Sequence, residues 1–302
     1  MLLANIHDYI RLDNFSSEQS YSIANYYDKI KFLAQTANAT KKIGFYGQPD
    51  QKTIDIFKEE NFEFIDLDIN FHNKNHKIVP DVYCHIIRDI LNNAIALKDD
   101  LEYVLCTTGR DKCDQGRGVR DILCQMDFKL IDASNYNLIP LREPIISRSR
   151  GNLRDRVIRI MELVYSPLTE DEIKYYTNMQ CNPVFNFHGV PPQDIDLLSL
   201  FPEETHIQGW TRLVEMGIPY KVELEWEVDN ELPTVYFSQS FCNKQLMSEY
   251  LAKKHNGLYV DGHGFITNSI KAKLEAFISL RNENMVFKKE IGFKSYLSGA
   301  KQ

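Results

Sequence analysis

Residues 80–123 read Pro80-Asp-Val-Tyr-Cys84-His-Ile-Ile-Arg88, then an apolar-rich segment, then Tyr103-Val-Leu-Cys106-Thr-Thr-Gly109, and then Cys113-Asp-Gln-Gly-Arg117. This order predicts a helix that begins near Cys84, a buried strand over residues 103–107 and a second helix that begins at Cys113. Helices that alternate with strands are typical of a parallel α/β sheet, whose chemistry gathers at the carboxyl ends of the strands. We therefore expect both cysteines at that edge of a sheet.

The same alternation continues on both sides of this stretch. In the first half of the chain the pattern predicts strands over 42–47, 62–68, 103–107 and 128–132, with helices over 51–60, 82–96 and 113–126. In the second half it predicts strands over 183–187, 234–238 and 257–260, with helices over 194–200, 243–255 and 268–280. Residues 220–226 alternate apolar and charged side chains, so we expect a strand or an extended excursion there.

We predict an α/β fold with two Rossmann- or flavodoxin-like lobes, each built on a parallel sheet. The expected parts are an N-terminal helical region (1–41), a first α/β lobe (42–150), a helical bridge (151–181) and a second α/β lobe (182–302). The bridge follows from an apolar stripe over 153–164 and from Thr169 with Glu172 three residues later, which is the pattern of a capping box.

Composition excludes several classes of protein. The chain has 302 residues with 43% hydrophobic and 25% charged residues, an ordinary globular balance, and its net charge of −7 argues against nucleic acid as the main partner. No apolar run approaches the roughly 20 residues of a membrane span, and the first residues do not read as a signal peptide. We therefore expect a cytoplasmic protein without membrane partners. Its six cysteines are too few for a disulfide scaffold.

Three cysteines are candidate metal ligands. Cys242 follows the strand predicted over 234–238, as Cys113 follows the one over 103–107. A helix amino terminus favours the thiolate, which is the form that binds metal. We therefore hypothesise an iron–sulfur cluster held by Cys84, Cys113 and Cys242. Cys106 competes with Cys113 as the second ligand; a zinc site would lack a C-x-x-C pair; and the alternative is that all six cysteines are ordinary buried residues.

Other polar residues have two interpretations each. His188 is either a proton donor or acceptor at a strand end or a polar turn residue. Arg88 and His85, one turn into the helix after Cys84, either bind a substrate carbonyl or carboxylate or cover the helix surface, which we expect of His85. His263 follows a predicted strand and stays unassigned. A run of six arginines either meets phosphates or an acidic partner, or forms a solvated helix face: Arg142, Arg148, Arg150, Arg154, Arg156 and Arg159.

At the three cysteines the chain resembles the 2-hydroxyacyl-CoA dehydratase/benzoyl-CoA reductase family. The matching segments are a cysteine-to-arginine helix start (Cys84 to Arg88), Cys113-Asp114 with Arg117 and Arg120 beyond it, and Ser240-Phe-Cys242-Asn243 after a late strand. The resemblance covers roughly residues 42–280. The chain is shorter than the usual subunits, it lacks the family's Gly-Ala-x-Pro segment, and Asn243-Lys244 stands where the family has Asp-Pro.

The resemblance implies a [4Fe-4S] cluster on Cys84, Cys113 and Cys242 with one iron open, between two lobes. From their positions in the chain we predict His188 and Arg88 as catalytic residues. It implies a lyase that eliminates water from a 2-hydroxyacyl thioester, an acyl-CoA, through a ketyl radical. It also implies an ATP-dependent iron–sulfur activator and a homologous second subunit or a homodimer as partners. The alternatives are an ATP-driven reductase of the benzoyl-CoA or double-cubane-cluster type and a shortened, non-catalytic cluster-carrying subunit.

Overall fold

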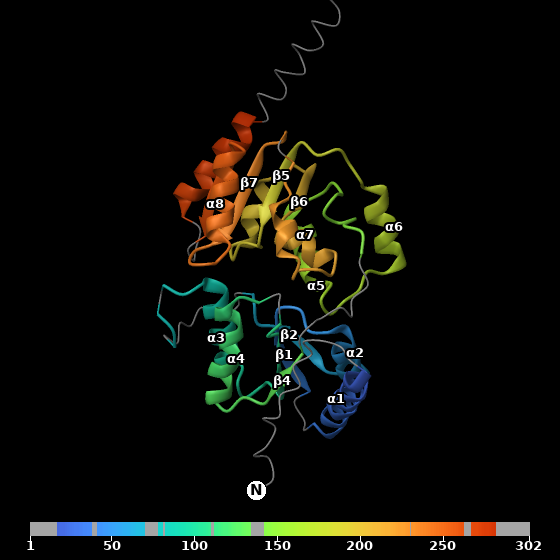
Figure 1. Ribbon diagram of the computed structural model, residues 1–302. Coiled ribbons are helices and arrows are strands. Elements are labelled where there is room, and N and C mark those ends of the chain that lie inside the picture. Colours follow the sequence, from blue (N-terminus) through green and yellow to red (C-terminus); the bar gives the residue numbers. More distant parts are fainter. Residues whose placement is uncertain are drawn as a thin grey trace, which may run out of the picture. The chain divides into compact units, whose positions relative to one another are not determined.

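The computed structural model describes residues 17–37, 41–69, 78–80, 82–109, 112–133, 142–229, 231–262 and 267–281. The chain divides into two compact units. Unit 1 comprises Met1–Leu141 and Glu162–Pro167, and unit 2 comprises Arg142–Met161 and Leu168–Gln302. Each unit contains a four-stranded parallel sheet with helices, which confirms the predicted α/β fold with two Rossmann- or flavodoxin-like lobes (Figure 1).

Unit 1 alternates strands and helices along the chain. After α1 (Ser17–Thr36) its elements are β1 (Lys42–Tyr46), α2 (Gln51–Glu59), β2 (Glu63–Asp66), α3 (His85–Ala96), β3 (Tyr103–Cys106), α4 (Asp114–Gln125) and β4 (Leu130–Asp132). The strand order is β2-β1-β3-β4, and Phe45 pairs with Asp66 on one side and with Leu105 on the other. The order reverses between β1 and β3, and ligands of open α/β sheets bind at the carboxyl ends of the strands at such a point.

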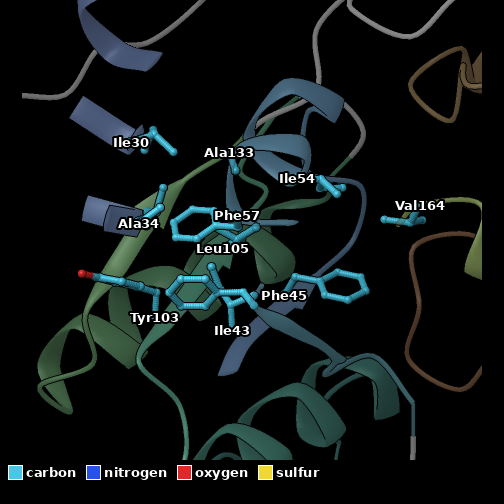
Figure 2. Packing of buried hydrophobic residues seen from close by; sticks show 12 residues of the cluster. Ile30, Ala34, Ile43, Phe45, Ile54, Phe57, Tyr103, Leu105, Ala133 and Val164 are labelled. Carbon is cyan, nitrogen blue, oxygen red and sulfur yellow. The ribbon is translucent and has the colours of Figure 1, made fainter. Parts of the chain in front are cut away.

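The core of unit 1 lies between the sheet and the first two helices. Helices α1 and α2 cover one side of the sheet, and α3 and α4 lie together on the other (Figure 1). Asp50 caps α2 by accepting a hydrogen bond from the Thr53 N–H at 2.9 Å. The cap sets the helix so that Phe57 faces Phe45 and Leu105 of the sheet, within a cluster that also includes side chains of α1 (Figure 2).

A short return segment, Glu162–Pro167, completes this core. Val164 is buried in the same cluster as Phe45, and the ring of Tyr165 lies 5.7 Å from the ring of Phe45 in an edge-on contact. Lys58 on α2 also donates to the main-chain carbonyl of Tyr165. These contacts attach six residues to unit 1 that are remote from it in sequence.

Unit 2 repeats the topology of unit 1. After α5 (Leu153–Glu162) and α6 (Glu170–Asn178) its elements are β5 (Phe185–Gly189), η1 (Ile195–Leu200), β6 (Thr205–Gln208), α7 (Trp210–Glu215), η2 (Val222–Trp226), β7 (Thr234–Gln239), α8 (Gln245–Lys254), β8 (Leu258–Gly262) and a helical run over 268–281. In the strand order β6-β5-β7-β8, the strand that is second in sequence again lies at the edge of the sheet, beside the strand that is first in sequence. The predicted capping box is confirmed, since Thr169 and Glu172 exchange hydrogen bonds at the start of α6.

Some predictions for unit 2 were wrong. Residues 220–226 are neither a strand nor extended, because the Leu224 N–H bonds to the Lys221 carbonyl and the Glu227 N–H to the Leu224 carbonyl, which closes the 3-10 turns of η2. The helix expected over 194–200 is also of the 3-10 type. The prediction omitted β6 and α7, whose segments are only four and six residues long.

Two further expectations concern the ends of the chain and the membrane. The N-terminal helical prediction is confirmed for Ser17–Thr36, while residues 1–16, 38–40 and His263 lie outside the described residues. No helix within the described ranges combines the length and the apolar character that a membrane crossing requires.

Candidate functional site

In unit 1, Cys84 lies close to the first turn of the helix that Cys113 precedes. Each directly precedes a helix, Cys84 before α3 and Cys113 before α4, and these two helices pack together. The Cys84 N–H donates to Oε1 of Gln115 at 3.4 Å, which joins the start of α3 to the first turn of α4. Cys84 is buried and Cys113 is exposed. The structure therefore brings two of the three expected ligand segments to one edge of unit 1.

The sulfur of Cys113 caps its helix. Its Sγ accepts a hydrogen bond from the Gly116 N–H at 3.4 Å, as a serine or aspartate oxygen does at other helix starts. An N–H directed at sulfur, together with the positive end of the helix dipole, stabilises a thiolate relative to a thiol. This environment suits a metal ligand or a nucleophile.

Cys242 has a matching environment in unit 2. It lies between the third strand of its unit, β7, and the helix that follows, which is the place of Cys113 in unit 1. Its Sγ accepts from the Lys244 N–H at 3.5 Å, and its own N–H donates to the Gln239 carbonyl at 3.1 Å. The turn thus formed places Phe241 at a φ of 61°, a left-handed conformation that phenylalanine rarely adopts.

Cys106, the competing ligand, has a different environment. It lies within β3 with no exposed surface, and its Sγ contacts the Val104 carbonyl at 3.8 Å. Burial raises the pKa of this thiol to about 12. Burial also raises the pKa of Cys181. Cys106 is thus a poor thiolate, whereas Cys113 is exposed at a helix start.

A complete set of metal ligands does not occur within the described part of the chain. No three or more His, Cys, Asp or Glu side chains in those ranges lie together so that they could hold a metal ion. Cys84 and Cys113 belong to unit 1 and Cys242 to unit 2. Any site that uses all three cysteines thus needs residues from both units.

His85 and Arg88, which follow Cys84 on α3, differ in burial. Arg88 is half-buried one turn on, and its N–H donates to the Cys84 carbonyl at 3.2 Å. His85 was expected to cover the helix surface, but it is buried. Arg88 therefore lies one helical turn after Cys84 on α3.

His188 lies inside β5 rather than in a turn and has no exposed surface. Its Nε2 is 2.7 Å from the main-chain carbonyl oxygen of Glu225, and because a carbonyl only accepts, Nε2 carries the hydrogen. Burial lowers the pKa of His188 to about 4, so the imidazole is neutral at physiological pH. Glu225 forms an ion pair with Lys244, two residues after Cys242. Contacts through Glu225 thus join His188 to the Cys242 turn.

The arginine run is largely engaged in structural contacts. The buried guanidinium of Arg156 donates to the main-chain carbonyls of Ser149 at 2.5 Å and Thr205 at 2.8 Å, and burial lowers its pKa to about 10. Arg159 pairs with Glu172, and Arg154 with Asp196. In unit 1, Arg120 forms a two-contact pair with Asp132. These arginines hold elements together, although Nε of Arg156 has no hydrogen-bond partner within the described ranges.

Sequence reasoning missed a pair of carboxyl groups at the carboxyl end of β2. The Asp68 N–H donates to Oδ1 of Asp66 at 2.9 Å, and Oδ2 of Asp68 accepts from the Gly47 N–H at 2.7 Å. Burial, followed by the charge of Asp68, raises the pKa of Asp66 to about 8, while the charge of Lys112 opposes this. The pKa of Asp66 is therefore shifted toward neutral pH. The available signal was two aspartates at the end of the strand predicted over 62–68.

Comparison of the chain with protein-family models finds no match, and comparison with curated protein sequences also finds none.

Proposed function

We propose that this chain is an iron–sulfur protein in which Cys84, Cys113 and Cys242 are the thiolate ligands of a [4Fe-4S] cluster. One observation supports the proposal above all. Cys113 and Cys242 both lie between the third strand and the following helix in two units of identical strand order, and each sulfur accepts a main-chain N–H. Cys113 is the N-cap of its helix, and Cys242 lies two residues before the N-cap, Lys244. Iron–sulfur clusters are held by cysteine thiolates, and helix starts are a common place for them.

The donor chemistry of the three residues fits the cluster. A set of three thiolates suits iron–sulfur ligation, and the environment of Cys106 excludes that residue as a ready thiolate. Neither unit provides three such ligands among its described residues. The proposal therefore requires that the two units bring Cys242 to the Cys84 and Cys113 segments.

The reaction that we propose is the elimination of water from a 2-hydroxyacyl thioester such as an acyl-CoA. A bound cluster would supply Lewis-acid and one-electron chemistry. Arg88 would bind the thioester carbonyl, because it is held one turn from Cys84. Asp66, a carboxyl group of raised pKa at the carboxyl end of β2, would donate a proton to the leaving hydroxyl. The carboxylate formed would then accept the proton that the β-carbon loses, so that water departs and Asp66 is protonated again. His188, buried and neutral, would orient the Cys242 turn through Glu225 and Lys244. An ATP-dependent activator and a second subunit belong to the same proposal.

The decisive experiment is iron and acid-labile sulfide analysis with electron paramagnetic resonance on protein purified without oxygen. We expect about four irons per chain, and we expect the iron to be lost in Cys84→Ala, Cys113→Ala and Cys242→Ala. Cys124→Ala is the matched control, since Cys124 lies on α4 beyond the helix start and should leave the iron unchanged. Protein without iron, or iron indifferent to the three substitutions, would overturn the proposal.

A binding measurement tests the substrate class separately. An acyl-CoA titrated into the full chain should bind about tenfold more weakly to Arg88→Gln, since a charge-assisted hydrogen bond contributes roughly 1.5 kcal/mol or more. Arg117→Gln is the control, because Arg117 is already engaged with Asp114 and the Gly109 carbonyl. Equal affinity in both variants would remove Arg88 from the site without affecting the cluster proposal.

A further inference from the structure

One face of the sheet in unit 2 is polar although it is buried. Strands β5 and β7 are buried along their whole length. Parallel sheets covered on both sides normally carry apolar side chains on both faces. Here one face carries Phe185, Phe187, Val235 and Phe237, and the other carries Asn186, His188, Gln208, Thr234 and Tyr236. We refer to the second set as the polar face.

The registers show that the polar face is continuous across three strands. His188 pairs with Gln208 of β6 on one side and with Tyr236 of β7 on the other, and the His188 and Tyr236 rings lie 5.2 Å apart. Asn186 pairs with Thr234 one step back along β5 and donates to its hydroxyl at 3.4 Å. Segment η2 covers this face, since the Glu225 carbonyl meets His188.

Unit 1 shows that the fold does not require such a face. Both Tyr46 and His188 directly precede a glycine of positive φ, Gly47 and Gly189. In unit 1 the pairing partner of Tyr46 is Cys106, and Gly44 pairs with Val104 two residues before. At these positions unit 1 has the small or apolar side chains of Gly44, Val104 and Cys106 together with the phenol of Tyr46, whose buried hydroxyl also lacks a partner within the described ranges. The imidazole and amide groups of the polar face therefore distinguish unit 2 from unit 1.

Four buried atoms of this region can only accept hydrogen bonds. They are Nδ1 of His188, which is bare because Nε2 carries the hydrogen, Oδ1 of Asn186, Oε1 of Gln208 and Oε2 of Glu225. Within the described ranges none of the four has a hydrogen-bond partner. Acceptors cannot satisfy one another, and a buried acceptor without a donor costs free energy. The Tyr236 hydroxyl on the same face also has no partner within the described ranges, but one hydroxyl can donate to only one acceptor. The region thus requires further donors from outside the protein.

The surrounding charges select the kind of donor. Glu225 is already paired with Lys244, and the positive charges of Lys244 and Arg212 both act on His188. A cation would be repelled by these two groups, whereas a neutral donor would not. We propose that the polar face binds hydroxyl groups, either of water or of a small alcohol, with Nδ1 of His188 as the central acceptor. This site does not depend on the proposed cluster, and all its residues belong to unit 2.

The position of Gly209 supports an arrangement built around the imidazole. A Cβ on Gly209 would lie 2.8 Å from Cε1 and 3.0 Å from Nδ1 of His188, so this close approach and the φ of 66° both require glycine. Main chain thus holds the ring on the Gly209 side, while Glu225 holds Nε2. The ring is fixed in one orientation, as a directional acceptor must be.

Thermal unfolding of two matched variants tests whether the acceptors are occupied. Gln208→Met removes Oε1 with little change of shape, and Gln239→Met removes an amide whose hydrogen bond to the Pro191 carbonyl is known, at 3.2 Å. If Gln208 has a hydroxyl partner, both variants should lower the Tm, by about 2–4 °C each. A Gln208→Met protein with an unchanged or higher Tm would overturn the proposal, because removing an orphaned buried acceptor relieves a cost.

A crystal structure of the unaltered full chain, with and without an ethanol soak, identifies the occupant. A water molecule within hydrogen-bond distance of His188 Nδ1 that is still present after the ethanol soak would support a solvent site. Displacement of that water by the ethanol hydroxyl would support a site for an alcohol ligand. A Gln208 amide that is reversed and donates directly to Nδ1, with no molecule between them, would overturn the proposal. This structure also decides the matter if a variant fails to fold.

Discussion

The guanidinium of Arg159 donates hydrogen bonds to both carboxylate oxygens of Glu172. The Nε–Oε1 distance is 2.6 Å and the Nη2–Oε2 distance is 3.1 Å. The same carboxylate accepts from the Thr169 N–H at 2.8 Å, so it closes the capping box of α6 while it pairs with α5. One side chain thereby fixes both the start of a helix and its attachment to the preceding helix.

The Glu172 contacts predict an acid-sensitive contribution to stability. The hydrogen bonds from Arg159 lower the pKa of Glu172 from its usual 4.5 to about 2. The contribution is therefore complete above about pH 4.5 and is lost as the pH falls to about 2. Glu172→Gln keeps a capping-box side chain but not the ion pair. It should cost about 0.5–1 kcal/mol at pH 7, because the pair is partly solvated.

Urea unfolding at pH 7 and at pH 2.5 checks this contribution. The difference between the original protein and Glu172→Gln should shrink at the lower pH. Glu170→Gln is the control, because Glu170 lies in the same first turn and should show a smaller effect, from the helix dipole alone. A constant difference across this pH range would contradict the assigned role of the carboxylate.

Asp66 predicts the opposite dependence on pH. Burial and the charge of Asp68 raise its pKa from 3.8 to about 8, so the folded protein retains a proton that the unfolded chain releases. Stability should therefore fall as the pH rises from about 4 to 8. Asp66→Asn keeps Oδ1 as the acceptor for the Asp68 N–H and cannot ionise. The free energy of unfolding of this variant should depend less on pH. Relative to the original protein, it should be higher at pH 8.5 than at pH 5 by at least about 1.4 kcal/mol.

The matched variant for Asp66 is Asp68→Asn. It removes the second cause of the raised pKa and leaves the first, burial, in place. Its pH dependence should lie between those of the original protein and Asp66→Asn when urea unfolding is followed at both pH values. Parallel curves for all three proteins would show that Asp66 ionises normally in the folded state.

At position 241, in the turn before Cys242, we expect glycine to give a more stable protein than alanine. Phe241 holds a φ of 61° and is 43% exposed, so its backbone carries a strain that its packing offsets only in part. Neither Phe241→Gly nor Phe241→Ala has the ring, but only alanine keeps the backbone strain of a positive φ. Phe241→Gly should therefore be about 1 kcal/mol more stable than Phe241→Ala. Chemical denaturation of the two variants measures this. Equal stabilities would mean that the turn relaxes without cost.

Two glycines in the left-handed region predict contrasting costs of a methyl group. A Cβ on Gly189 would lie 2.0 Å from the Phe237 carbonyl oxygen, whereas a Cβ on Gly151 would meet nothing within 4 Å. Gly151→Ala should cost about 1–2 kcal/mol, from backbone conformation alone. Gly189→Ala should cost more than about 3 kcal/mol, because β5 and β7 must separate. Similar melting temperatures for the two variants would contradict the close approach of these strands.

The strands of unit 1 were predictable because each forms a short apolar run with a turn residue after it, as in Ile43–Tyr46 before Gly47. Strand β6 escaped prediction because Thr205-His-Ile-Gln208 contains a single strongly apolar residue. Its burial depends on its neighbours in the sheet, which local sequence does not describe. The alternation over 220–226 indicated the wrong element for the same reason, since contacts with the rest of unit 2 determine how that segment is covered.

For the candidate site, the placement of cysteines before helices followed from their position between strand and helix patterns. The contact of His188 with Glu225 could not be predicted in this way. The two residues are 37 positions apart, and the acceptor is a main-chain oxygen, which every residue has. Sequence patterns identify side chains with the required chemistry. They do not identify the backbone groups that select a tautomer or that leave an acceptor bare.

The return of Glu162–Pro167 to unit 1 has a consequence for synthesis on the ribosome. The first 141 residues of the chain contain α1 to α4 and β1 to β4, yet Val164 and Tyr165 are still missing from their positions against Phe45. A nascent chain therefore exposes this apolar surface until residue 167 has left the exit tunnel, after part of unit 2 has already been made. A fragment that ends at residue 141 would carry the same exposed surface permanently and should associate through it.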